Sequence, residues 1–205
     1  MSDQSDIDVI EHFFFIQSPF AYLGLSRLKS IATNQGKTIR HRPMDIGRIF
    51  PETGGTPLAK RPPARQAYRL VELERWRTYL GIPLNLEPAF FPFPAWPASG
   101  LILEARARGL DADALVLAIM RGCWAEQRNM GDEGDLALVL AEAGFDTDLL
   151  TAVLDNPELN NAFEAESEAA LSKGVFGSPF YIWNGEAYFG QDRLDFLDRS
   201  LAAKT

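Results

Sequence analysis

The stretch FFFIQSPFAYLGL, residues 13–25, joins an apolar run to an amphipathic segment through a Ser-Pro pair. The apolar residues at positions 13–16 are typical of a short strand that is buried on both faces. Pro19 suits the first turn of a helix, where the N–H that proline lacks has no partner to lose. Ser18 is then expected to cap the helix at the positive end of its dipole. Such a serine either only caps the helix, or helps to hold an anion and to favour ionisation of a thiol.

The flanking residues extend this joint into a β-α-β unit. A strand over about residues 10–16 leads to a helix over 19–34, and the alternation in 37–45 predicts a second strand. The two strands should be parallel, with a right-handed connection between them. Glycines and prolines predict a loop over 46–63, and the apolar spacing that follows predicts a helix that ends before Gly81.

The middle of the chain has helical patterns, and strand patterns return only near its end. The prolines of 82–97 exclude a regular helix or a central strand. Two strands, 180–183 and 186–189, flank the hairpin signal Asn184-Gly185, and a last helix is expected over 191–202. Helices are expected between these parts, over 99–108, 111–130, 133–143, 147–155 and 157–173. This order predicts an α/β fold, in which a helical insertion interrupts a small mixed sheet.

The composition excludes several classes of protein. The chain has 205 residues, enough for one domain or one domain with an insertion, and its net charge of −8 argues against general nucleic-acid binding. Neither a secretory signal nor a membrane span is present, so a soluble, cytoplasmic protein is expected. The lone Cys123 excludes an internal disulfide, and we expect it to be a buried packing residue. With only His12 and His41 beside it, no metal site is expected, and His41 is expected on a strand surface.

Basic residues are concentrated in one part of the chain. Residues 27–77 hold 12 of the 20 Lys and Arg but only 4 of the 28 Asp and Glu, a net charge of +8 against −16 for the remainder. This basic segment either faces acidic parts of its own chain or of a second subunit, or it surrounds a site for a small anion.

A second joint, GVFGSPFYIWNG, spans residues 174–185. Pro179 directly precedes a strand that must be central in a four-stranded sheet, where proline is awkward. A cis peptide between Ser178 and Pro179 would resolve this by turning the chain sharply, and an ordinary trans turn proline is the alternative.

Both joints together resemble a known family. The strand-Ser-Pro-helix joint, Gly174-Val175-Phe176-Gly177 before Pro179, and Gly190-Gln191-Asp192-Arg193 are similar to motifs of the 2-hydroxychromene-2-carboxylate isomerases. These enzymes are related to the kappa-class glutathione transferases and the DsbA-type disulfide oxidoreductases. The resemblance implies a thioredoxin-like fold made by 1–57 and 174–205, with a helical insertion domain over 58–173 whose helix 157–173 lies at the border. It also implies a homodimer that uses glutathione.

The resemblance also implies roles for particular residues. Ser18 would hydrogen-bond the glutathione sulfur and favour its thiolate, and the absence of a cysteine there removes dithiol chemistry. Pro179 would be cis, and the backbone of Ser178 would pair with the cysteinyl backbone as an added strand does. Amides at Gln191 suit the γ-glutamyl carboxylate and the Asp192 carboxylate suits its α-ammonium, although an acid there is also an ordinary helix N-terminal residue.

The substrate side is less well defined. The expected reaction is isomerisation of an aromatic-ring-cleavage carboxylate through a transient glutathione adduct. Glutathione transfer, peroxide reduction, and a binding module without turnover are the alternatives. The segment 54–61 (GGTPLAKR) departs from the Asn-Lys-Pro-Pro-like segment of many relatives. Candidate substrate contacts are Phe20, Lys60, Arg61, Arg65 and Trp96. Arg69 is considered with Arg61 and Arg65 as a contact for a substrate carboxylate; solvated helix-face arginines and a packing tryptophan are the alternatives.

Overall fold

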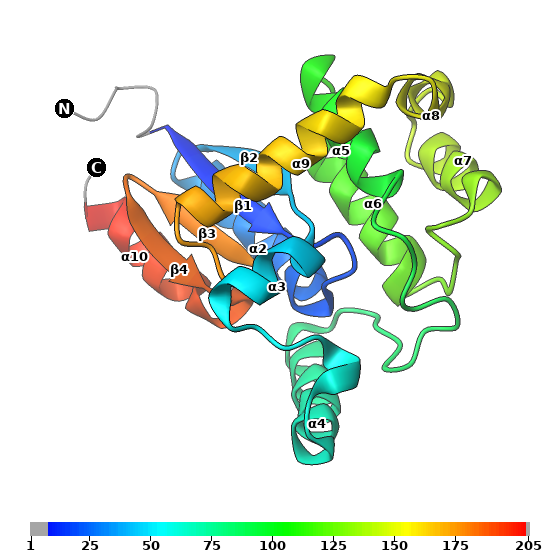
Figure 1. The fold of residues 1–205 in the computed structure, drawn as a ribbon. Helices are drawn as coiled ribbons and strands as arrows, with labels where there is room; N and C mark the ends of the chain where they lie inside the picture. The colour runs from blue at the N-terminus through cyan, green and yellow to red at the C-terminus, as the bar shows by residue number, and fades with distance from the viewer. Residues whose placement is uncertain (1–7, 204–205) are drawn as a thin grey trace.

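A mixed four-stranded sheet organises the computed structural model, which describes residues 8–203 (Figure 1). Its order is β2-β1-β3-β4. β1 (Val9–Phe14) and β2 (Thr38–Pro43) are parallel, whereas β3 (Phe180–Trp183) is antiparallel to both β1 and β4 (Glu186–Phe189). The strand that follows Pro179 is therefore central, as its sequence predicts.

Helices cover both faces of the sheet (Figure 1). α2 (Pro19–Asn34) and α10 (Leu194–Ala203) pack against one face through a core that includes Leu28, Tyr181 and Leu197. α3 (Ile46–Thr53) and α9 (Pro157–Ser172) pack against the other face through a core that includes Ile49, Ala170 and Phe180. The apolar run of β1 therefore lies between two layers of helices, which explains why it does not alternate with polar residues.

The remaining helices form a block beside the sheet. They are α4 (Pro63–Leu80), α5 (Ala98–Ala107), α6 (Ala112–Trp124), α7 (Glu133–Glu142) and α8 (Asp148–Leu154), and a short 3₁₀ turn, η1 (Leu58–Lys60), precedes them. Their largest shared core is continuous with Phe14, Ile16 and Leu23 of the β1-α2 joint. The result is a thioredoxin-like α/β fold with an α-helical insertion.

Two expected boundaries are wrong. The loop expected over 46–63 contains α3, because the Asp45 carboxylate accepts a hydrogen bond from the Gly47 N–H at 2.8 Å and Gly54, at φ +76°, ends the helix. The helix expected over 111–130 ends at Trp124, where the carbonyl accepts a hydrogen bond from the Asn85 N–H at 2.6 Å. In both cases a hydrogen bond that the local sequence pattern does not predict sets where the helix begins or ends.

His41 is buried, so its expected place on a strand surface is wrong. Its Nε2 lies 2.9 Å from a carboxylate oxygen of Asp113, and its Nδ1 lies 2.9 Å from Nδ1 of His12, which stacks between Phe14 and Tyr181. Because a carboxylate only accepts, His41 Nε2–H donates to Asp113, and in the neutral pair His12 Nδ1–H donates to His41. This chain of contacts ties β1 and β2 to α6.

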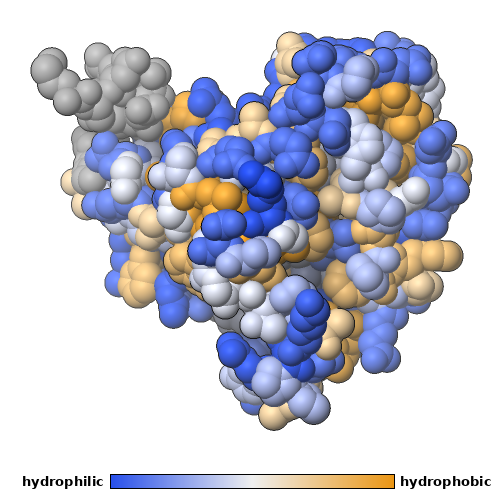
Figure 2. All heavy atoms as spheres, in the orientation of Figure 1, coloured by the Kyte–Doolittle hydropathy of each residue, from blue (hydrophilic) through white to orange (hydrophobic). Residues whose placement is uncertain are grey.

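The surface visible in Figure 2 mixes polar and apolar side chains rather than forming one apolar face. Within residues 8–203, no helix combines the length and the apolar character that crossing a membrane requires.

Candidate active site

Ser18 caps α2, as its sequence position predicts. The residue is 7% exposed, and its Oγ accepts a hydrogen bond from the Ala21 N–H at 3.2 Å. The first turn contains no acidic residue, and the Phe20 N–H has no acceptor within the described part of the chain. The positive end of the helix dipole is therefore not offset by a local carboxylate, and it lies beside a hydroxyl.

The two Ser-Pro joints meet at the carboxyl end of β1. The Ser18 hydroxyl donates a long hydrogen bond, 3.4 Å, to the Ser178 carbonyl oxygen, while the Ser178 hydroxyl accepts from the Phe15 N–H at 2.9 Å. The Ser178–Pro179 peptide is cis, which confirms the expectation drawn from the resemblance. Because it accepts from the Phe15 N–H, the Ser178 hydroxyl is turned toward the end of β1.

The backbone of Ser178 retains hydrogen-bonding capacity. No acceptor for the Ser178 N–H exists among residues 8–203, and its carbonyl receives only the long bond from Ser18. A donor without an acceptor and a weakly engaged acceptor next to a central strand are what an added extended segment requires.

The start of the last helical segment lies against this backbone. The Gly190 N–H donates to the Pro179 carbonyl at 2.9 Å, and Gly190 has φ +95°, a conformation that favours glycine. The Gln191 side chain is buried and accepts from Arg27 at 3.1 Å. The Asp192 carboxylate is exposed to solvent and pairs with Arg193 at 2.8 Å. Asp192, rather than the buried Gln191 side chain, is therefore accessible to a charged ligand, which would share its carboxylate with Arg193.

This assembly of β-α-β, cis-proline hairpin and helical insertion agrees with what a comparison of the sequence finds. A family model described as the DSBA-like thioredoxin domain matches residues 9–202. The chain belongs to this family.

Within the DSBA-like family, the chain groups with enzymes. A 2-hydroxychromene-2-carboxylate isomerase of Sphingobium xenophagum is 30% identical over 94% of this chain and 97% of the relative. The kappa 1 glutathione S-transferase of Caenorhabditis elegans is 32% identical over 92% of this chain and 88% of the relative. A solved structure of 2-hydroxychromene-2-carboxylate isomerase has a TM-score of 0.79 and 27% identity, with 95% of both chains covered. Relatives of this DSBA-like chain thus include proteins named as isomerases and proteins named as kappa-class glutathione transferases, both at about 30% identity.

Gln17 is a site residue of this DSBA-like chain that the sequence analysis did not single out. It is 5% exposed, and its side-chain amide exchanges hydrogen bonds with the backbone N–H and carbonyl of Phe93. The sequence feature that indicates a role for Gln17 is a polar amide side chain between an apolar run and Ser18. Through Gln17, the proline-rich segment 82–97 is attached directly to the Ser18 joint.

The candidate substrate contacts of this family member have different surroundings. Lys60 and Arg65 are exposed, and the Arg61 guanidinium donates to the Thr56 carbonyl at 2.8 Å. Phe20 is partly buried and packs against the largest core. Trp96 lies 6.3 Å from the Phe163 ring and closely over Gly100, so its contacts are those of a packing residue between helices.

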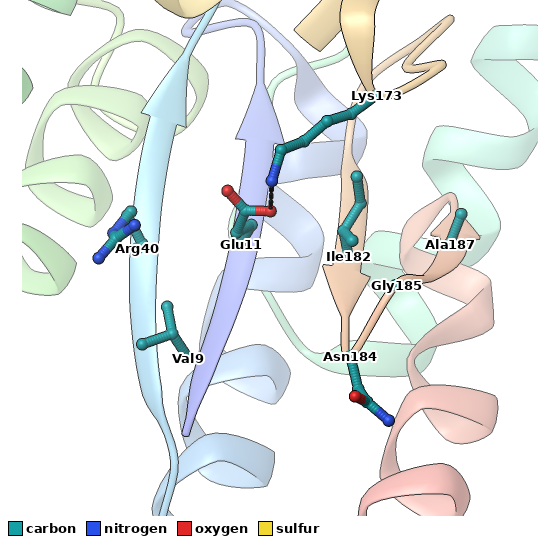
Figure 3. Close-up of a pocket in the computed structure, with 8 residues that line it drawn as sticks. All are labelled: Val9, Glu11, Arg40, Lys173, Ile182, Asn184, Gly185 and Ala187. Atoms are coloured by element: carbon teal, nitrogen blue, oxygen red, sulfur yellow. Dashed lines mark hydrogen bonds and ion pairs between the residues drawn. The ribbon is translucent and has the colours of Figure 1, made fainter. Parts of the chain in front are cut away.

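Two other features of the DSBA-like chain lie apart from the Ser18 joint. The cavity in Figure 3 is lined by residues that include Val9, Glu11, Arg40 and Asn184, at the end of the sheet where β1 begins and β3 ends. Ser18 follows the opposite end of β1.

Cys123 is buried, and burial raises the pKa of its thiol to about 12, which makes it a poor nucleophile at neutral pH.

Proposed function

We propose that this chain is a glutathione-dependent isomerase of the 2-hydroxychromene-2-carboxylate type, acting on an aromatic-ring-cleavage carboxylate. The observation that carries the proposal is the meeting of the Ser18 hydroxyl with the Ser178 backbone, whose N–H has no acceptor within residues 8–203. The names of the isomerase relatives support the same reaction.

The residues present fit glutathione. An extended tripeptide needs a backbone donor and acceptor, which Ser178 offers, and its α-ammonium group needs a carboxylate, which Asp192 offers. Its sulfur needs a hydrogen-bond donor near positive charge, which Ser18 and the start of α2 offer. The Ser18 hydroxyl is only weakly engaged, so donating to a thiolate loses little.

When bound, glutathione would supply a thiolate that adds to an unsaturated carbon of the substrate and leaves after rotation about the resulting single bond. In this scheme the Ser18 hydroxyl donates to the sulfur and the α2 dipole favours its ionised form. The Ser178 backbone fixes the position of the cysteinyl unit, and Asp192 fixes the γ-glutamyl end. The proposal places the protein in the cytoplasm as a homodimer.

A second candidate function is glutathione transfer or peroxide reduction of the kappa type. The similarity to kappa-class relatives favours it, since one of them is as similar to this chain as the isomerases are. All of these reactions would use the same thiolate at Ser18. In isomerisation the sulfur leaves the carbon again, in transfer it stays bound to the product, and in peroxide reduction it is oxidised by the hydroperoxide, which is released as an alcohol, and a second glutathione completes the disulfide.

One experiment separates these functions. The purified protein is mixed with 2-hydroxychromene-2-carboxylate with and without glutathione, and products are identified by liquid chromatography and mass spectrometry. Glutathione-dependent conversion to an isomer of unchanged mass supports the isomerase. Accumulation of a product that carries glutathione, or turnover of a hydroperoxide alone, supports the kappa-type function. Tight glutathione binding with no turnover of any of these compounds would show a binding module and contradict both.

A further inference from the structure

The structure divides the basic segment 27–77 into two groups. Seven of its Lys and Arg side chains form ion pairs with acids of the same chain: Arg27, Lys29, Lys37, Arg42, Arg48, Arg75 and Arg77. Five form no ion pair with any residue of the described chain: Arg40, Lys60, Arg61, Arg65 and Arg69. Four of these five follow one another from η1 into α4, so the unpaired positive charge is concentrated in one place.

Arg69 is the least solvated of the four and lies over aromatic rings. Its guanidinium carbon is 5.7 Å from the centre of the Phe91 ring and 5.9 Å from that of the Trp124 ring, within the range of a cation–π contact. Burial, and after it the charge of Arg61, lower the pKa of Arg69 to about 10. The side chain thus remains charged at neutral pH.

No carboxylate of the described chain offsets this charge. A desolvated guanidinium without an anionic partner is costly, and bringing another arginine close to it raises that cost. Aromatic faces compensate part of the cost but leave the N–H donors of the guanidinium unused. A carboxylate, which accepts two parallel N–H bonds from one arginine, is the ligand that would satisfy them.

The segment that carries Phe91 is connected to the Ser18 joint. Phe93, two residues further on, exchanges backbone hydrogen bonds with the Gln17 side chain, and Gln17 precedes Ser18. Phe91 itself is only partly buried, and its ring packs at 5.0 Å against Trp124. A flat ligand that lies along this segment could therefore contact Phe91 at one end and approach Ser18 at the other.

We propose that Arg69, resting on Phe91 and Trp124, binds the carboxylate of an aromatic acid, with the aromatic part of the acid against Phe91. Trp96, the tryptophan candidate from the sequence, instead packs between helices away from this arginine. The inference rests on the proposed function in one respect, since it takes the bound acid to be the substrate of the Ser18 site.

The test uses trans-cinnamate as the probe, trans-cinnamamide as its uncharged counterpart and sulfate as an anion without a ring. Binding is measured by calorimetry on the full chain and on three variants. Arg69→Met removes the charge, Arg69→Lys keeps the charge but loses the two-pronged geometry, and Arg75→Met removes an exposed arginine of the same helix that pairs with Glu72. Thermal melting verifies that each variant is folded.

We expect the original chain to bind cinnamate at least tenfold more tightly than cinnamamide or sulfate. Arg69→Met should weaken cinnamate binding at least tenfold, Arg69→Lys should weaken it less, and Arg75→Met should leave it unchanged. Equal binding of cinnamate by the original chain and Arg69→Met, or no preference for cinnamate over both other compounds, would overturn the inference.

Glutathione binding, measured on the same proteins, separates this inference from the proposed function. Arg69→Met should bind glutathione as the original chain does. Absence of glutathione binding to the original chain would contradict the proposed function while leaving the cinnamate result intact. Equal loss of glutathione and cinnamate binding in Arg69→Met would show a general disturbance of the fold and overturn the specific role of Arg69.

Discussion

The Ser18 hydroxyl lies 3.4 Å from the carbonyl oxygen of Ser178, although 160 positions separate the two residues in the chain. This contact brings a helix N-terminus, a hydroxyl and an open stretch of backbone to one point. Each of these groups is ordinary alone, and their combination is what a bound thiol-containing peptide requires.

Replacing Ser18 by Ala should raise the pKa of the thiol of bound glutathione, because the thiolate sulfur loses a hydrogen-bond donor. The thiolate absorbance of the complex, followed across pH, measures this. Loss of the cap should also lower the stability of the fold by about 1 kcal/mol. Asp132→Ala is the matched control, since it removes the cap of α7, where the carboxylate accepts from the Asp135 N–H at 3.0 Å. An equal change of thiol pKa in both variants, or none in Ser18→Ala, would remove Ser18 from the chemistry.

Replacing Asp192 by Asn should weaken glutathione binding roughly tenfold, because the ion pair between the carboxylate and the α-ammonium group is replaced by a hydrogen bond from the ammonium to a neutral amide. Calorimetric titration with glutathione measures the effect. Asp198→Asn is the control, because Asp198 is also on the last helical segment but accepts from Gln35 at 2.8 Å. Unchanged affinity in Asp192→Asn would assign the γ-glutamyl end to other residues.

Turnover of an anionic substrate should depend on salt through the unpaired basic residues. We expect kcat/KM to fall as ionic strength rises while kcat changes little, since exposed charges are screened over about 8–10 Å near physiological salt. Lys60→Ala, Arg61→Ala or Arg65→Ala should make kcat/KM fall less steeply with ionic strength, that is, reduce the salt slope. Arg48→Ala, which removes a basic residue paired with Glu168, is the control. If Arg48→Ala reduces the slope equally, total charge rather than the unpaired group is responsible.

The buried histidine pair should make the fold less stable in weak acid. Burial, and after it the charge of His41, hold the pKa of His12 well below its usual value of 6.5. The unfolded chain therefore takes up a proton near pH 6.5, whereas the folded chain does not. The contribution of His12 to the free energy of unfolding is therefore fully present above that pH and is lost as the pH falls below it. Each pH unit of descent should cost about 1.4 kcal/mol until the folded state also titrates.

Urea unfolding at a series of pH values measures this loss. His12→Phe, which keeps a flat ring between Phe14 and Tyr181, should remove most of the slope between about pH 6.5 and pH 5. Glu11 and Asp113, whose pKa values are lowered in the fold, act only at lower pH, below their ordinary values of 4.5 and 3.8. An unchanged slope in His12→Phe would show that other groups control the acid response.

Much of the architecture follows from the sequence because its signals are local. Ser18 before Pro19 specifies a helix start, Asn184-Gly185 specifies a hairpin, and the apolar run before Ser18 specifies a buried strand. Such choices depend on backbone conformation and on periodic burial, which neighbouring residues determine. The helix over 46–53 is not predicted from the sequence, because Pro51 and the glycines and prolines that follow the helix suggest a loop, while its Asp45 cap acts through a single hydrogen bond.

The partners of charged and polar side chains depend on tertiary structure. The sequence leaves open whether basic residues face acids or a ligand, and only the folded chain separates paired Arg48 from unpaired Arg69. His41 lies among arginines in the sequence, yet folding brings it to His12 and Asp113 inside the protein. Electrostatic energy falls with distance between atoms, not with separation along the chain, so it is decided only when the chain has folded.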